Sequence, residues 1–217
     1  MVVDGAAVPV MGTDRLVERI TRCVTGLAFF GVGISLQIES RLGNPPWDTF
    51  HQGVAMQVGL GIGTVIIITG VALLILFWIP LRQKPGLGTI LNALEIGLVA
   101  NLALDAIPVV ESMAVRIAML IGGIVMVAFG SALYIGSGLG PGPRDGIMTG
   151  LAARGVKVRV ARTLIEVTVL VIGWLLGGQV GVGTVLFALA IGPLVQPLLP
   201  RLAIRPGPRS SSGSAPA

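Results

Sequence analysis

The 217-residue chain is 53% hydrophobic and only 12% charged, with a mean hydropathy of +0.91, whereas a soluble domain has about 25% charged residues. A soluble core cannot hide this excess of apolar side chains. Helical spans of about 20 residues leave room for roughly six membrane crossings and for no separate soluble domain. The net charge of +5 comes from basic residues beside apolar segments. We therefore expect these residues to set the orientation of the chain in the membrane, and we expect no nucleic-acid binding.

Residues 1–14 precede the first apolar run, and we expect them to be flexible. Apolar runs predict transmembrane helices at about residues 20–38, 62–79, 88–104, 116–135, 158–176 and 182–199. Two further helical stretches, at 46–58 and 143–154, are too short and too polar to cross. The tail at 204–217 is rich in Pro, Gly and Ser, so it cannot bury enough apolar surface to fold and is predicted to be disordered.

Basic residues predict the orientation of the chain. With the N-terminus in the cytoplasm, only Arg41 and Arg116 of the 15 Lys and Arg residues stand on the outer side. Because Lys and Arg resist translocation, we expect both termini on the cytoplasmic side of the membrane.

The two halves of the chain repeat one another. When Gly33 is aligned with Gly130, identical residues coincide at Leu36 and Leu133, Ser40 and Ser137, Gly43 and Gly140, Pro46 and Pro143, and Asp48 and Asp145. Two one-residue adjustments extend the register to Trp78 with Trp174 and Gly97 with Gly192. The sequence therefore predicts an all-α membrane protein of two three-span repeats, at residues 15–110 and 111–203. Because each unit has an odd number of spans, the repeats must be inverted in the membrane.

Two segments related by the repeat, 42–48 and 139–145, each break a helix and start another. Glycine permits a strained turn, proline at the first helical position loses no hydrogen bond, and aspartate in the first turn accepts from free N–H groups. The residues of this structural motif are Gly43, Pro46 and Asp48 in the first half and Gly140, Pro143 and Asp145 in the second. Each short helix that follows could be re-entrant, with its positive N-terminal end toward a centre shared by both repeats. The alternative is a pair of interfacial turns whose aspartates only cap surface helices.

Broken backbone at membrane depth survives only where protein or a water-filled cavity surrounds its polar groups, which favours a ligand site there. The candidate ligand-binding residues are Asn44, Trp47, Asp48, His51, Glu95, Arg144 and Asp145. Glu95 lies within the third span and is replaced by Ala190 in the second half, so it is either a functional group or a protonated packing residue. For His51, the alternative is interfacial hydrogen bonding.

No pattern in the sequence indicates an enzyme. A single His and a single Cys do not suffice for the common clusters of metal ligands, and neither a nucleophile elbow nor a phosphate loop is present. We therefore expect no catalysis, no metal and no cofactor. The expected partners are the lipid bilayer and a small polar solute, and the sequence leaves a homo-oligomer open.

These expectations favour a transporter or channel for a small polar solute, with the short helices framing the site and Glu95 as the coupling group. The alternative is a non-transport membrane scaffold or accessory factor that supports an export or biosynthetic system.

Three runs of the chain carry a resemblance to a known family. They are LGNPPWD at 42–48, RQKPGLGT at 82–89 and YIGSGLGPGPRDG at 134–146. With these runs the chain resembles the bacterial YczE-like integral membrane proteins, related to YitT, from Arg15 to about Leu202. The resemblance implies a multi-pass protein of the bacterial cytoplasmic membrane and carries over no site residues.

Overall fold

The computed structural model describes residues 2–3, 6–7, 15–78, 85–152 and 154–204. Strands β1 (Val2–Val3) and β2 (Ala6–Ala7) form a small antiparallel pair, and the rest of the regular structure is helical. The predicted flexible N-terminus and disordered tail lie largely outside the described residues.

Within the described residues, eight α-helices and one π-helical turn make up this helical part. In chain order they are α1 (Leu16–Ser40), α2 (Pro46–Val58), α3 (Ile62–Leu73), the π-helix η1 (Leu74–Trp78), α4 (Leu87–Ala106), α5 (Met113–Gly136), α6 (Pro143–Ala152), α7 (Val158–Leu175) and α8 (Val182–Leu202). Each predicted helix is present, and the two short ones, α2 and α6, begin at the predicted prolines.

Four helices, α1, α4, α5 and α8, are long and apolar enough to cross a membrane. Helices α2 and α3 meet that criterion as a pair, bent by 110° at the break between them. Helix α7 is outside this group because its 18 residues include Arg159, Arg162 and Glu166. By length and composition the described residues thus contain four or five spans, which supports a multi-pass membrane protein.

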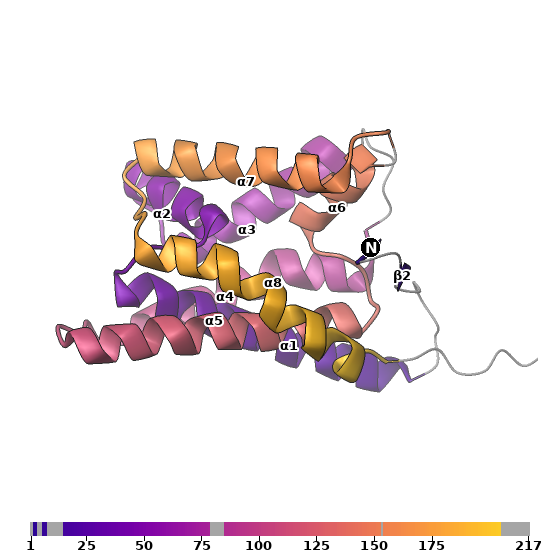
Figure 1. The fold of residues 1–217 in the computed structure, drawn as a ribbon, viewed down its shortest axis with the longest axis horizontal. Coiled ribbons are helices and arrows are strands. Elements are labelled where there is room, and N and C mark those ends of the chain that lie inside the picture. The colour runs from indigo at the N-terminus through magenta and orange to yellow at the C-terminus, as the bar shows by residue number, and fades with distance from the viewer. Residues whose placement is uncertain (1, 4–5, 8–14, 79–84, 153, 205–217) are drawn as a thin grey trace, which may run out of the picture.

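Helices α1 and α5 lie side by side and run antiparallel (Figure 1). Gly26 faces Gly130 and Gly33 faces Gly123: a Cβ on Gly26 would lie 2.8 Å from the Gly130 carbonyl oxygen, and a Cβ on Gly33 would lie 2.9 Å from that of Gly123. Only glycine lets two helix backbones approach this closely. The repeat register equates Gly26 with Gly123 and Gly33 with Gly130, so the two contacts are equivalent to each other.

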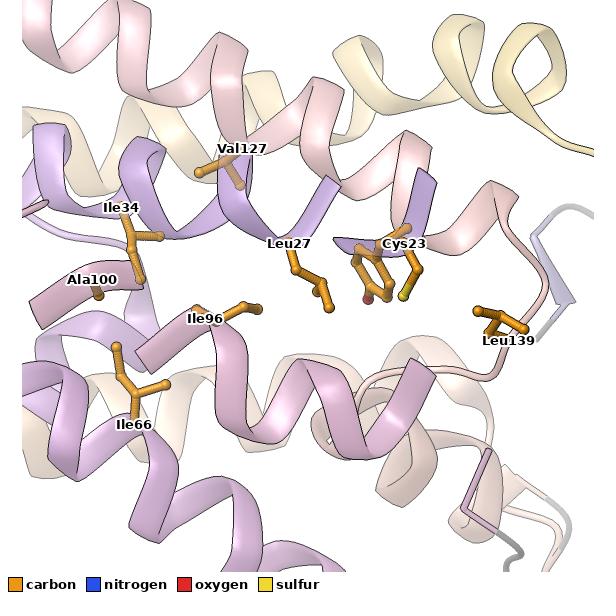
Figure 2. Close-up of a cluster of buried hydrophobic side chains, with 9 residues drawn as sticks. Cys23, Leu27, Ile34, Ile66, Ile96, Ala100, Val127 and Leu139 are labelled. Atoms are coloured by element: carbon orange, nitrogen blue, oxygen red, sulfur yellow. The ribbon is translucent and has the colours of Figure 1, made fainter. Parts of the chain in front are cut away.

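The apolar core fills the space between this helix pair and α3 and α4. Figure 2 shows Cys23, Leu27 and Ile34 from α1 beside Ile96 and Ala100 from α4. Cys23 is fully buried, in keeping with the packing role that burial gives an unpaired cysteine.

The loops after α1 and α5 make matching hydrogen bonds across the molecule. The Gly183 N–H donates to the Leu42 carbonyl oxygen over 2.8 Å, and the Gly88 N–H donates to that of Leu139 over 2.9 Å. Gly88 and Gly183 are equivalent in the repeat register, as are Leu42 and Leu139. Each loop is therefore held by the first turn of the last helix of the other half.

Two arginines repeat the same pattern. Arg19 donates to the Ser137 carbonyl oxygen and Arg116 donates to that of Ser40, both over 2.7 Å. The offset of 97 positions that relates Gly33 to Gly130 also relates Arg19 to Arg116. Because these carbonyls end α5 and α1, each arginine satisfies a group that the helix itself leaves free.

The glycine contact is tested by comparing Gly123→Ala with Gly122→Ala in the same turn of α5. A Cβ on Gly123 would lie 2.6 Å from the Gly33 carbonyl oxygen, whereas one on Gly122 would meet open space. We expect Gly123→Ala to destabilise the fold by about 1–3 kcal/mol through overpacking. We expect Gly122→Ala to be neutral or stabilising by up to about 1 kcal/mol, since alanine favours helix. Thermal unfolding of the purified variants measures this, and equal effects would contradict the contact.

Candidate functional site

The two short helices begin after turns that require glycine. Gly43 has φ 111° and Gly140 has φ 126°, values that other residues rarely adopt. A side chain on Gly43 would also collide with the backbone of Gly181, and one on Gly140 would lie 2.8 Å from the Thr89 hydroxyl oxygen. The predicted strained turns are confirmed, and both press against the start of a long helix.

The first turns of α2 and α6 meet inside the bundle. Arg144 Nη2 lies 4.0 Å from Asp48 Oδ1, with the Asp48 side chain 3% exposed and the Arg144 side chain 26% exposed. The Arg144 guanidinium carbon lies 4.9 Å from the centroid of the Trp47 ring, within range of a cation–π interaction. Three of the predicted site residues are thereby brought together, from helices about a hundred residues apart in sequence.

His51 joins this group from the next turn of α2. Its Nδ1 lies 3.4 Å from Asp48 Oδ1, and the side chain is buried. Its other ring nitrogen, Nε2, has no hydrogen-bond partner among the described residues. A buried polar atom without a partner costs free energy, and this is where a water or a ligand would be stabilised.

A small cavity lies beside His51 and Arg144. Its volume is about 10 Å³, which is room for roughly one water molecule. Its lining comes from α2, α3, α4 and α6: His51, Ile66, Thr69, Gly70, Leu73, Asn92, Ala93, Ile96, Pro143 and Arg144. In this conformation the site is therefore closed to any larger solute.

Asn44, just before α2, holds a loop. Its Nδ2 donates to Gln52 Oε1 over 2.8 Å, the Gln179 N–H donates to the same oxygen over 2.7 Å, and the Asn44 N–H donates to the Gln179 carbonyl oxygen over 3.0 Å. Asn44 thus ties the start of α2 to the loop before α8. Gln52 and Gln179 were not among the predicted site residues, because neither lies in the repeated motif.

Asp145 differs from its repeat equivalent Asp48. Asp145 accepts from the Tyr134 hydroxyl over 3.1 Å and interacts with the Gly142 backbone N–H, the group that a helix cap satisfies. Asp48 cannot cap in this way because Pro45, at the matching position, has no N–H. The expected capping role therefore holds for Asp145 and not for Asp48, which contacts His51 and Arg144 instead. Tyr134 was also not predicted, although it is the only tyrosine.

Glu95 is set apart from the other predicted residues. It is half-buried on α4. It does not line the cavity, although Asn92 and Ile96 of the same helix do. The predicted coupling role of Glu95 stays a prediction.

The contact between Asp48 and Arg144 is tested by a double-mutant cycle with Asp48→Asn and Arg144→Gln. For a contacting pair on two elements we expect a coupling free energy of about 0.5–3 kcal/mol, because each single change leaves the other side chain without its partner. Arg162 and Glu166 form the control pair, being 2.9 Å apart but 57% and 34% exposed, where about 0.3–0.5 kcal/mol is expected. Chemical unfolding in detergent measures both, and a coupling of zero for the first pair would contradict the geometry.

Comparison with known proteins identifies relatives over most of the chain. It is 38% identical to an uncharacterized protein of Haemophilus influenzae over 180 residues, 82% of each chain. It is 33% identical to the uncharacterized membrane protein YczE of Bacillus subtilis over 190 residues, 87% of this chain and 88% of the relative. It is 29% identical to the uncharacterized protein YyaS of Bacillus subtilis over 181 residues, 81% of this chain and 89% of the relative.

No solved structure matches the chain. A family model described as a family of unknown function, DUF6198, matches residues 17–199. The similarity to YczE confirms the resemblance predicted from the glycine- and proline-rich runs. The chain therefore belongs to the DUF6198 family and is a relative of the membrane protein YczE.

Proposed function

We propose that this protein is a membrane carrier for a small polar solute, with the solute site between its two halves at Asp48, His51 and Arg144. The observation that carries the proposal is the ion pair between the first turns of α2 and α6. Charged groups inside a membrane protein are costly and mark ligand or ion pathways by default. The positive N-terminal ends of two short helices add polar groups at the same place.

The proposal includes an inverted repeat. The antiparallel helices α1 and α5 make two glycine contacts, Gly26 with Gly130 and Gly33 with Gly123, that the repeat register exchanges, an arrangement that a two-fold axis perpendicular to those helices produces. If both helices cross the bilayer, this axis lies in the membrane plane, as in many transporters. Six crossings, with α7 as the fifth, and cytoplasmic termini in the inner membrane complete the proposed topology.

Packing that differs between the halves supports a carrier rather than an open channel. Gly97 of α4 presses against the backbone of Gly63 in α3, whereas a Cβ on Gly192, the equivalent residue in α8, would meet nothing within 4 Å. Two similar units thus pack differently. In the proposed cycle they exchange these two packings, which opens the closed site to one side and then to the other.

A second candidate function is a membrane scaffold or accessory factor without transport. The small volume of the cavity, about 10 Å³, favours it, because a scaffold needs no space for a solute. The polar side chains at the cavity favour the carrier, because a scaffold has no use for an unpartnered buried His51 nitrogen. Glu95 is proposed as the coupling group of the carrier, one turn from the cavity-lining Asn92.

Uptake into proteoliposomes tests the proposal. Wild type, Arg144→Gln and Asp48→Asn are compared in counterflow of labelled amino acids, carboxylates, sugars and amines, with Arg159→Gln as the control. Arg159 is exposed in the first turn of α7, so its replacement removes the same charge away from the site. We expect accumulation of at least one solute class by wild type and the control, and an at least tenfold loss in both site variants. Folded wild type that accumulates none of them, or an equal loss in the control, would contradict the carrier.

A further inference from the structure

We propose that the end of the bundle where α1 begins and α8 ends binds the headgroup of an anionic phospholipid. A cavity of about 610 Å³ lies there, within the size range of ligand pockets, roughly 300–1,000 Å³. It is lined by Arg15, Glu18, Arg22, Pro200, Arg201, Ala203 and Ile204. In Figure 1 the start of α1 and the end of α8 lie next to each other at one end of the bundle.

The charges at this cavity suit a phosphate group. Glu18 accepts from Arg15 Nε and from Arg22 Nη2, both over 2.9 Å, and this holds the two arginines in place. Arg201 in the last turn of α8 is exposed. Three arginines against one glutamate leave two positive charges. Guanidinium groups bind phosphate through paired hydrogen bonds.

Arg22 also joins the two helices that form the cavity. Its Nη1 donates to the Leu202 carbonyl oxygen over 2.7 Å, one of the free carbonyls at the end of α8. The walls of the cavity are therefore fixed relative to each other before a ligand arrives. Pre-organisation of this kind lowers the entropy lost on binding.

The position in the bilayer favours a lipid over free phosphate. Arg15 immediately precedes α1, Arg22 lies in its second turn and Arg201 lies in the last turn of α8, and both helices are candidate spans. Since charged side chains avoid the hydrocarbon region, this level corresponds to the headgroups. Leu16 and Val17, next to Arg15, are 44% and 79% exposed, so apolar surface is available there for acyl chains. Basic pockets between spans are typical sites for anionic headgroups.

Native mass spectrometry of the full chain tests this inference, with phosphatidylglycerol and phosphatidylcholine as the added lipids. We expect phosphatidylglycerol to bind at least tenfold more tightly than phosphatidylcholine, and Arg201→Gln to remove most of that preference. Arg159→Gln is the matched control, because it removes an exposed arginine that does not line the cavity. Arg15→Gln serves as a second variant in case Arg201→Gln does not fold.

Three outcomes would overturn the inference. They are equal affinity for the two lipids, an equal loss of preference in Arg159→Gln, and displacement of the lipid by inorganic phosphate at the same molar concentration. The first two would show that no specific site exists. The third would show that the cavity binds the anion without its acyl chains. None of them bears on the carrier, because the basic cavity and the Asp48–Arg144 site share no residue.

Discussion

The close contact of the α1 and α5 backbones is the constraint on which the rest of the structure depends. At Gly26 with Gly130 and Gly33 with Gly123 there is no room for a side chain on either helix. Because the two helices run antiparallel, the loops at the ends of α1 and α5 fall at opposite ends of the bundle. The short helices that follow them then start from opposite ends, and their first turns meet between the halves.

Backbone breaks inside the bundle are stabilised by groups from the other half. The Leu42 and Leu139 carbonyls accept from Gly183 and Gly88, and arginines satisfy the last turns of α1 and α5. Backbone polar groups that water does not reach need partners within the protein, and here each half supplies them at the end of the other half's first helix. The irregular segments thereby become places where polar side chains can collect, and Asp48, His51 and Arg144 collect there.

The sequence predicted where the helices of the site begin better than it predicted which side chains contact each other. The helix starts at Pro46 and Pro143 were predictable because proline at the first helical position and glycine before it are local signals. The pairing of Asp48 with Arg144 was not, since it depends on how two distant helices cross. The repeat also suggested equal roles for Asp48 and Asp145, but Pro45 lacks the N–H that Gly142 supplies. Glu95 does not line the cavity because of the way α4 is rotated about its own axis. In a span that is apolar all round, the hydrophobic pattern of the sequence does not predict that rotation.

The orientation of the two halves is measured most directly by labelling single cysteines from each side of the membrane. Cys23 is the only cysteine, so a Cys23→Ser background leaves none. Leu60 and Val156 are equivalent loop residues, 46% and 38% exposed, each after a glycine with positive φ. With an impermeant thiol reagent, Leu60→Cys should react from the outer side of the membrane and Val156→Cys only from the inner side. Reaction of both from the same side would contradict the inverted repeat and, with it, a site formed where the two halves meet.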